Sequence, residues 1–489
     1  MPTDLTQPSA AATVKFPHRS RRGVLLGLTA PQLAGVTFTG LLLLGVLLTS
    51  GVLGAIRLIP LWAAILAAVF VRHHGRSLAD WAPVALRYAQ RRLTRQLVWL
   101  TRPSTRPRRD GLLHLPGTAA SLRVVTSPDR RLGAVHDPHQ HTLTSVVKVS
   151  SQAFALLDPA TQSHNVSGWG RTLAALARTG HVARIQVLER TVPDSGDALT
   201  RYWTEHGNAG AHLAGPIYSD LLAVAGPAAA PHESYVALAL DMKAARRLIN
   251  QAGGGLSGAF AVLTQLASTF DQAARHSGLV PTGWLSAEEV AAVIRTAYDP
   301  ASSAALDRWS QSGRPQAAPA AAGPVVLVEK ADSIRTDSAH HATFWIENWP
   351  RIETSPGFLH QLLFTSGVRR TLSLTYDPKA LDAALKDVQR RKATVIADAA
   401  ERQRKGQVDS EEDAVEYADI KERERQLIAG HADVGLTGLV TVSADSHEEL
   451  NAACAAIETA AVSALVDLRP LTWQQAEAFT SAALPLARA

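Results

Sequence analysis

Residues 24–71 read VLLGLTAPQLAGVTFTGLLLLGVLLTSGVLGAIRLIPLWAAILAAVFV, and this stretch decides how the chain is placed. Its 48 residues carry one charge, that of Arg57. A membrane-spanning helix needs about 20 apolar residues, so the stretch holds two spans and a tight turn. Thr49-Ser50-Gly51 suits that turn, between a first span at 24–48 and a second at 52–71. The sequence therefore predicts a transmembrane helical hairpin, in which the long side chain of Arg57 reaches the headgroups.

Basic residues flank the hairpin on both sides. Lys15 and Arg19, Arg21 and Arg22 precede it, and ten arginines follow between residues 72 and 109. Lys and Arg near the ends of spans stay on the cytoplasmic side, so both termini are expected in the cytoplasm and the protein in the cell membrane. A cleaved signal peptide is the alternative, but its apolar core has only about 7 to 15 residues.

Positive charge is concentrated around the hairpin. Residues 15–109 hold fifteen Lys and Arg and one acidic residue, Asp80, a net of +14, which leaves −8 for the rest of a chain whose net charge is +6. Anionic lipid attracts each basic residue near a membrane surface by about 1 kcal/mol. Anionic membrane lipid is therefore the expected partner, and direct sequence-specific binding of nucleic acid is not expected.

The segment 72–109 mixes arginines with large apolar side chains. Between Ser77 and Trp99 this mixture is typical of a helix that lies in the membrane interface. A connector helix packed on the body is the alternative. We assign membrane contact to eight residues of the hairpin and this segment: Arg57, Arg72, Arg76, Trp81, Arg87, Arg91, Arg92 and Arg95.

After residue 110 the chain alternates β-branched runs with Ala- and Leu-rich helical patterns, which is typical of an α/β or α+β body. Helix-capping residues are predicted at Asp158, Ser286, Asp377 and Ser446. Strands are predicted at 142–150, 181–189, 234–240, 325–328, 342–347, 370–375 and 436–443.

The body divides at the Pro-, Ala- and Gly-rich stretch 311–324 into a first lobe at 110–310 and a second at 325–489. In both lobes a strand ends in a capping residue that starts a helix, as in ALALDMKAA, SLTYDPKAL and TVSADSHEEL. This pattern suggests a duplicated ferredoxin-like unit, with independent use of the same cap as the alternative. The expected fold is a membrane-anchored α+β protein: a basic segment at 1–23, a two-helix transmembrane hairpin, an interfacial helix with its linker, and two cytoplasmic α/β lobes.

Charge is densest between residues 382 and 429, where both signs recur at helical spacing. This predicts a long solvated helical hairpin that is interrupted near Gly406, and it is one candidate for contact with a partner. The single cysteine, Cys454, excludes an intramolecular disulfide framework and lies in an apolar helical pattern.

Motifs for chemistry are scarce. No Gly-Lys-Ser/Thr occurs, so a phosphate-binding loop is not predicted, and the glycines at 253–258 are expected to start a helix. His136, His139 and His141 lie close in sequence but suit a surface loop better than a zinc site. We therefore predict no catalytic residue, no metal and no cofactor. Four aromatic residues are candidates either for the core or for partner docking: Trp345, Trp349, Trp473 and Phe479.

Two parts of the chain resemble components of bacterial secretion machines. KFPHRSRRGVLLGLTAPQLAG, the hairpin and SLADWAPVALRY are similar to the PrgI-type two-span inner-membrane subunit of type IV secretion and conjugation systems, in its actinobacterial form. DPKALDAALKDVQRRKA, GLTGLVTVSADSHEELNAACAAI and AEAFTSAALPL resemble the non-ATPase N-terminal domain of the TraC-type conjugation ATPases. Together these resemblances cover residues 15–109 and 140–489.

The resemblance implies an inner-membrane scaffold without catalysis of its own. It would anchor a separate hexameric ATPase below the secretion channel, contact other channel subunits and form an oligomer within the assembly. The two-span core subunit of type VII secretion is one alternative. A membrane-tethered enzyme with a site built from scattered residues is another.

Overall fold

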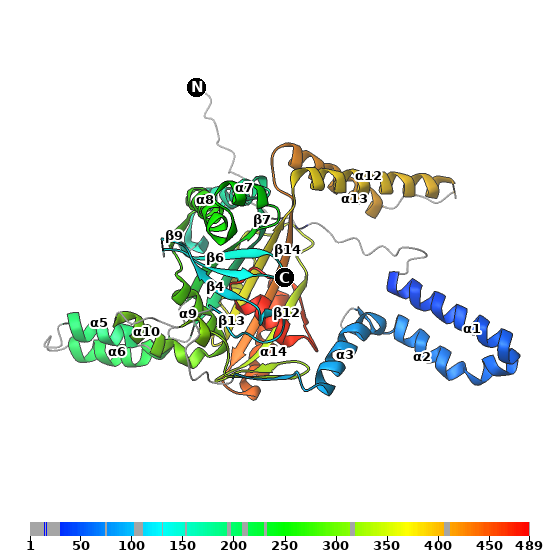
Figure 1. Ribbon diagram of the computed structural model, residues 1–489, viewed down its shortest axis with the longest axis horizontal. Helices are drawn as coiled ribbons and strands as arrows, with labels where there is room; N and C mark the ends of the chain where they lie inside the picture. The colour runs from blue at the N-terminus through cyan, green and yellow to red at the C-terminus, as the bar shows by residue number, and fades with distance from the viewer. Residues whose placement is uncertain are drawn as a thin grey trace, which may run out of the picture.

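The computed structural model describes residues 14, 16, 30–73, 76–101, 111–129, 131–151, 154–192, 197–207, 214–228, 232–312, 318–404 and 411–488. The protein is mixed α/β, with one large antiparallel sheet and an apolar helix near the N-terminus (Figure 1). Most of the basic segment predicted at 1–23 lies outside the described residues, as do residues 102–110 of the predicted linker.

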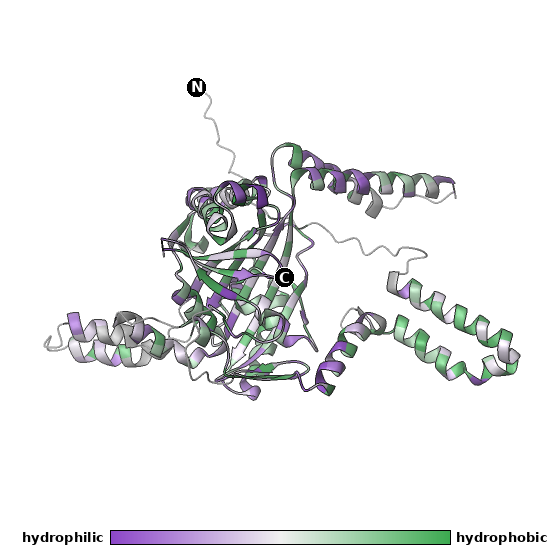
Figure 2. Cartoon of the chain, viewed as in Figure 1, coloured by the Kyte–Doolittle hydropathy of each residue, from purple (hydrophilic) through white to green (hydrophobic). Residues whose placement is uncertain are grey.

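Two apolar helices project together from the body (Figures 1 and 2). Helix α1 (Ala30–Arg57) bends at Gly51, whose φ of 65° and ψ of −169° are not helical. Helix α2 (Ile59–Phe70) returns beside it, and the Gln32 side-chain amide donates a hydrogen bond to the Val69 carbonyl at 3.3 Å. The bend therefore lies where the sequence predicts the turn.

Among the described helices, α1 has the length and hydropathy of a membrane span. Its segment Gln32–Arg57 has 26 residues and a mean hydropathy of 2.1, with 6% of the span window buried. Helix α2 has 12 residues. The second span predicted at 52–71 is divided between the end of α1 and α2, because Leu58 leaves helical geometry and Pro60 has no N–H to continue the hydrogen-bond ladder. One helix long enough to cross a membrane is thus present, and the second predicted span is not a continuous helix.

The chain enters the body through a short ribbon and a helix. Strands β1 (Arg72–His73) and β2 (Arg76–Ser77) pair with each other, and helix α3 (Leu78–Leu93) runs across the base of the hairpin (Figure 1). Strand β3 (Val98–Leu100) then pairs with β10 (Val326–Glu329) at the edge of the main sheet. The segment predicted to lie on the membrane is therefore also part of the body.

In the described part of the chain, thirteen strands form one antiparallel sheet. Its order is β3, β10, β11 (Ile334–Arg335), β12 (His340–Asn348), β14 (Val434–Ala444), β13 (Arg369–Pro378), β7 (Val182–Thr191), β8 (His232–Asp241), β6 (Thr142–Ser151), β5 (Gly133–Asp137) and β4 (Arg123–Thr126). Strand β9 (Leu279–Trp284) pairs with β6, and β15 (Asp467–Pro470) pairs with β12.

The sheet consists of two units with the same strand order. Taking the strands of each unit in chain order, β6, β7, β8 and β9 lie in the order 4-1-3-2, and so do β12, β13, β14 and β15. Each unit has a β-α-β-β-α-β chain order, the ferredoxin-like arrangement suggested by the sequence. The units join edge to edge where β7 pairs with β13 from Ile185–Tyr376 to Arg190–Thr371. The two predicted lobes are therefore halves of one continuous sheet.

Helices cover both faces of this sheet, because both faces of the central strands are apolar. In β6, Val146 and Val147 point to opposite faces and enter different cores. One face carries α4 (Pro159–Arg178), α7 (Arg246–Gln251), α8 (Gly255–Arg275), α11 (His360–Leu363) and α14 (His447–Ser463). The other carries α9 (Ala287–Tyr298) and α15 (Gln475–Ala483), with α10 (Ser303–Gln311) beside α9.

Helix α15 and the residues after it tie the two units together. Phe479 and Leu484 pack in one core with Val146 and Leu188 of the first unit. The buried amide of Gln186 donates to the Ser373 hydroxyl at 2.8 Å and to the Leu484 carbonyl at 3.1 Å. The second half of the chain thus completes the core of the first.

Each unit also carries a projecting helical hairpin between its second and third strands (Figure 1). The first consists of α5 (Asp197–His206) and α6 (Ala214–Ala228), and the second of α12 (Leu381–Arg404) and α13 (Glu411–Ile428). The second lies in the charged region 382–429, where the sequence predicts a helical hairpin. The interruption predicted near Gly406 lies outside the described residues.

Candidate functional site at the joint between hairpin and body

Helix α3 begins with a capping box that fixes its direction. The Asp80 backbone N–H donates to the Ser77 hydroxyl oxygen at 3.3 Å, and the Asp80 carboxylate accepts from the Ser77 backbone N–H at 3.3 Å. One turn of the chain thereby satisfies two backbone donors that a helix start otherwise leaves free. The helix leaves the apolar hairpin in a defined direction.

An aromatic stack attaches α3 to the second unit. Trp81 is 4% exposed and meets Trp473 edge to face, with ring centroids 5.6 Å apart. The Arg469 guanidinium lies 5.7 Å from the Trp81 ring and 4.8 Å from the Trp345 ring. Desolvated cation–π contacts of this kind are worth about 2 kcal/mol each. Trp81 is therefore part of the joint, and it differs from the predicted lipid contact because its ring faces the body.

A buried ion pair forms the second attachment. Arg91 donates to Glu329 at 2.5 Å, and the Glu329 side chain is fully buried. The Ala476 backbone N–H donates to the same carboxylate at 3.2 Å. Burial raises the pKa of Glu329, against the opposing effect of Arg91. Because Arg91 has a buried partner, it too differs from the prediction of a free membrane contact.

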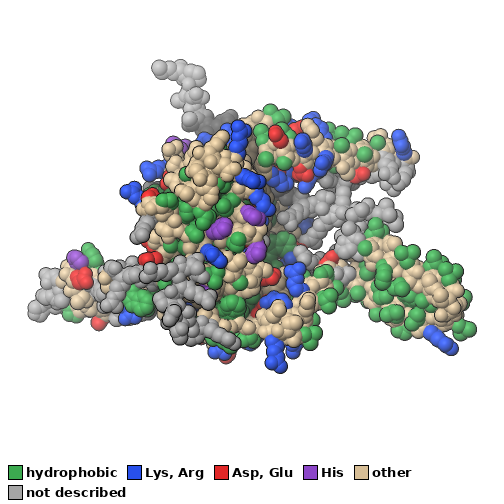
Figure 3. All heavy atoms as spheres, in the orientation of Figure 1, with side chains coloured by type: hydrophobic (Ala, Val, Ile, Leu, Met, Phe, Trp, Pro, Cys, Tyr) green, Lys and Arg blue, Asp and Glu red, His purple; other side chains and the backbone are tan. Residues whose placement is uncertain are grey.

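The remaining predicted membrane residues are distributed along the anchor region. Arg57 is exposed at the end of α1. Arg72 and Arg76 belong to the β1–β2 ribbon. Three exposed arginines lie on or just after α3: Arg87, Arg92 and Arg95. Figure 3 shows hydrophobic side chains over the α1–α2 hairpin and Lys and Arg side chains where α3 meets the body.

Val14 and Phe16, which precede the apolar hairpin, contact the body as well. The Val14 N–H donates to the Thr354 carbonyl at 2.8 Å, and the Thr354 N–H donates back at 3.2 Å. Phe16 stacks on Trp349 with ring centroids 4.9 Å apart and meets Phe358 at 5.5 Å. No pattern in the sequence announces this contact, because its partners lie more than 300 residues apart.

The four aromatic candidates for partner docking are therefore used inside the chain. Trp345 and Trp473 belong to the stack around Arg469, and Trp349 holds Phe16. Phe479 is 1% exposed and lies in the core beside Tyr298. Of the two roles predicted for these residues, Phe479 has the role in core packing.

The other sequence candidates have ordinary structural roles. Gly253, Gly254 and Gly255 have positive φ and lead into α8, as predicted. The backbone N–H groups of His139 and Gln140 donate to the Asp137 carboxylate, which makes a turn. Among the described residues no group of three or more potential metal ligands occurs.

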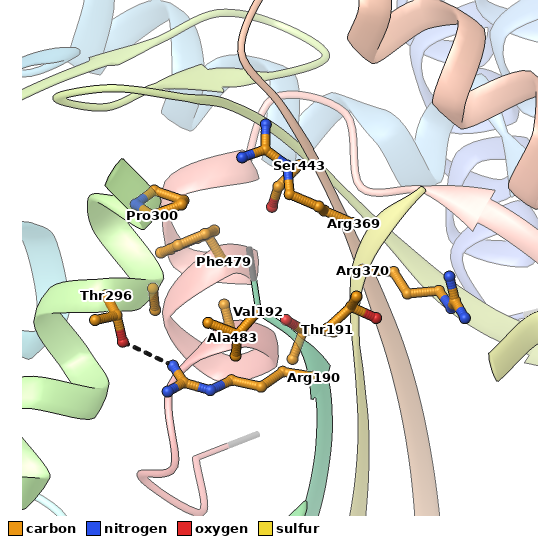
Figure 4. Close-up of a pocket in the computed structure, with 12 residues that line it drawn as sticks. Arg190, Thr191, Val192, Thr296, Pro300, Arg369, Arg370, Ser443, Phe479 and Ala483 are labelled. Atoms are coloured by element: carbon orange, nitrogen blue, oxygen red, sulfur yellow. Dashed lines mark hydrogen bonds between the residues drawn. The ribbon is translucent and has the colours of Figure 1, made fainter. Parts of the chain in front are cut away.

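The described residues also form a hollow near α9 and another near α3. One lies between α9, α15 and the ends of β7 and β13 (Figure 4), and its volume is about 30 Å³. Sites for small molecules measure about 300–1,000 Å³, so this cavity holds water at most. The Arg190 guanidinium at the edge of the cavity forms an ion pair with Glu233 at 2.7 Å and donates a hydrogen bond to the Thr296 hydroxyl at 3.0 Å. Burial would raise the pKa of Glu233, but Arg190 and Lys148 hold it at about 2.

The second hollow is an open groove of about 590 Å³ beside the joint. It is bounded by α3, β3 and the turn after β10, and its lining includes the cations Arg92, Arg95 and Lys330. It is the larger of the two hollows and the more open to solvent. No family model matches this chain, and no curated protein matches it either.

Proposed function

We propose that the protein is a non-catalytic scaffold of a type IV secretion or conjugation-like system, held in the cell membrane by two spans with both termini in the cytoplasm. Its body would present a separately encoded hexameric ATPase to the channel and contact other channel subunits. The resemblance of the anchor region and of the second half to such components supports the class of machine. The geometry of the described residues supports the topology.

The observation that carries the topology is the contact of Val14 and Phe16 with the body. These residues precede α1, whereas Thr354 and Trp349 follow α2. The segment before the hairpin and the body after it therefore lie on the same side. A chain that leaves this side through α1 has to return, which supports two crossings.

The lengths of the two arms suit two crossings. From Ala30 to the bend before Gly51 the first arm has 21 residues, about 31 Å at 1.5 Å per residue. From Val52 to Phe70 the return arm has 19 residues, about 28 Å. The hydrocarbon core of a bilayer is about 30 Å thick. Because the return arm bends at Leu58, it would cross as two helical pieces packed on the first arm.

The charged hairpin α12–α13 is the best-supported docking arm for the motor. Its helices are held together by Lys392–Glu424 at 2.8 Å and Arg423–Asp387 at 3.4 Å, and by a small core of their own. It projects from the body and leaves Ile396 and Val415 about half exposed. The aromatic clusters are weaker candidates because they already have partners in the chain.

The test uses the full chain in its native membrane with two matched pairs of substitutions. Ile396→Asp with Val415→Asp alters the α12–α13 arm, and Tyr202→Asp with Ile217→Asp alters somewhat more exposed apolar positions on α5–α6. We expect a Walker-type ATPase to co-purify with the wild type and the α5–α6 variant, and its recovery to fall at least about tenfold in the α12–α13 variant.

Nucleotide turnover by the purified full chain is measured in parallel and is expected to be absent. Turnover by this chain alone would support a membrane-tethered enzyme instead. If the co-purified ATPase proved to be the motor of a type VII system, the scaffold role would stand and the machine would be reassigned. Failure to recover any ATPase would contradict the scaffold role.

A further inference from the structure

The groove beside the joint combines several cations on two rigid walls. Tyr88 and Arg92 line it from α3, and Arg95 follows the end of that helix. Lys330 and Glu329 form the opposite wall. The Glu329 backbone N–H donates to the Leu97 carbonyl at 2.8 Å, so the two walls are tied together. The shape of the groove is fixed by the same strand pairing that attaches the anchor to the sheet.

The charge of this groove is strongly positive. Arg92, Arg95 and Lys330 make no ion pair with the described residues. The one acid in the lining, Glu329, is fully buried and already paired with Arg91 at 2.5 Å. Three cations without an ion-pair partner among the described residues therefore line an open volume of about 590 Å³.

Arg95 ends helix α3 in a left-handed backbone conformation. Its φ is 56°, its N–H donates to the Arg92 carbonyl, and the Gln96 N–H donates to the Arg91 carbonyl. This is the Schellman ending of a helix, in which the left-handed position is usually glycine because a Cβ is crowded there. An arginine at this position is sterically disfavoured, and here its exposed side chain lines the groove.

Apolar side chains border the cations. Val98 lines the groove and is exposed, as are Leu100 on the same strand and Leu93, which follows Arg92 in the sequence and is 84% exposed. Helix α3 also contacts both helices of the apolar hairpin at its base. A ligand that matches this surface has an anionic head next to an apolar tail and lies at the level where the hairpin leaves the body.

We propose that the groove binds the headgroup phosphate of an anionic phospholipid, with Arg92, Arg95 and Lys330 on the phosphate and the acyl chains beside Leu93. This proposal rests on the membrane placement proposed above. It goes further because it assigns a discrete site to one lipid class in place of diffuse attraction over the whole basic segment.

The experiment measures lipid binding to the full chain in mild detergent by native mass spectrometry, with phosphatidylglycerol and phosphatidylcholine as probes. The test variant is Arg92→Ala with Arg95→Ala and Lys330→Ala. The matched control is Lys243→Ala with Arg246→Ala and Arg247→Ala, which removes three exposed cations from the region of α7. We expect affinity for phosphatidylglycerol to fall about 10- to 100-fold in the test variant and to stay within about 2-fold in the control.

Arg95→Gly separates a binding role from a structural one. Glycine relieves the crowded backbone, so α3 should gain protection in hydrogen exchange while affinity for phosphatidylglycerol falls several-fold. Loss of both protection and affinity would mean that Arg95 acts only through the fold, and this would overturn the site.

Two further outcomes bear on the proposal. If the test and control variants lose affinity equally, the attraction is diffuse and the site is wrong. If the soluble headgroup glycerophosphoglycerol binds as tightly as the lipid, the site takes a free phosphodiester and the lipid assignment is wrong. Co-sedimentation of the test variant with vesicles of pure phosphatidylcholine is expected to match the wild type, because the apolar hairpin inserts without this site. If the wild type itself did not co-sediment with these vesicles, the membrane anchor would be refuted.

Discussion

The two ferredoxin-like units have the same strand order but differ at their outer edges. At the outer edge of the second unit, β3 pairs with β10, and helix α3 precedes β3 in the chain. The stack of Trp81, Arg469 and Trp345 attaches α3, and with it the apolar hairpin, to this unit. The matching edge of the first unit ends in β4 and β5, with α9 packed on them. The inserted hairpins differ as well, since α12 and α13 carry many charges of both signs whereas α6 carries one charged residue, Asp220.

The two units share the strand pattern that forms the sheet, and they differ in the residues that hold the apolar hairpin and line the groove. Apolar alternation along the strands is common to both units and produces the same sheet twice. The residues of the aromatic stack, the buried ion pair and the cationic groove lie on α3, on β3, at β10 and in the second unit. We therefore interpret the second unit as the half that carries the apolar hairpin, and the following substitutions test that interpretation.

The largest effect is expected where the units share a core. Phe479 is fully buried in the core that contains Val146 and Leu188 of the first unit. Phe479→Ala should lower the free energy of unfolding by about 3–5 kcal/mol, and Phe479→Leu by less than about 1.5 kcal/mol. Urea unfolding of the full chain in detergent, followed by tryptophan fluorescence, measures this. Two separate unfolding transitions in the wild type would show that the units unfold independently, which would contradict a shared core.

A smaller and more local effect is expected at the joint. Arg91→Ala leaves the buried Glu329 carboxylate without its cation, which should cost about 3 kcal/mol. Arg87 is exposed on the same helix, and Arg87→Ala should change stability by less than about 0.5 kcal/mol. Hydrogen exchange should show lost protection in α3 and β3 and little change in the first unit. Equal loss of protection in both units would mean that the joint does not belong to the second unit alone.

Acidification below about pH 6.5 should lower the stability of the fold through His341 in the second unit. Burial lowers the pKa of His341 to about 3, assisted by the nearby charges of Arg369 and His340, so between about pH 6.5 and 3 the unfolded chain binds a proton that the folded chain does not. Stability then falls as the pH drops through this window. In the first unit the pKa of Glu233 is held at about 2, and its contribution is lost only below about pH 4.5. The midpoint of thermal unfolding at pH 7 and pH 5 measures this, and His341→Gln should reduce the difference. An unchanged difference in this variant would assign the pH dependence to another group.

The smallest effect is expected on the charged hairpin. Arg425 pairs with Glu422 at 2.7 Å, and both side chains are at least half exposed. Arg425→Ala should change the free energy of unfolding by less than about 0.5 kcal/mol, because exposed ion pairs are screened by water. Urea unfolding provides the measurement. A loss above about 1 kcal/mol would show that this hairpin contributes to the fold, and its role as a separate docking arm would weaken.

Much of the body could be predicted from the sequence, because its long strands and capped helices have strong local patterns. TLTSVVKVS at 142–150 became β6, and the Asp158 cap started α4 as predicted. The sequence pattern did not predict β9, because Pro281 and Gly283 are unfavourable in a strand. It also missed β4 and β15, which have only four residues each. These strands form because neighbouring strands offer them hydrogen bonds, which a local pattern does not show.

The candidate site could be predicted only in part. The basic character of α3 was visible, but a tryptophan among arginines has the same pattern on a lipid surface and in a buried joint. Trp81 faces Trp473, and Arg91 faces Glu329, across more than 200 residues of sequence. Such pairings depend on the order of strands in the sheet, and so does the docking of Phe16 on Trp349. The strand order itself was only suggested by the repeated strand-to-helix caps.

Cysteine labelling of intact cells tests the placement of the hairpin and body most directly. Burial raises the pKa of the Cys454 thiol to about 12, so the native cysteine should stay unlabelled at neutral pH. Ser50→Cys places a thiol at the tip of the hairpin, and Ser312→Cys places one on the exposed surface of the body. With a membrane-impermeant maleimide we expect Ser50→Cys to be labelled in intact cells and Ser312→Cys only after the cells are opened. Labelling of both positions from the same side of the membrane would contradict a two-span anchor that holds the body in the cytoplasm.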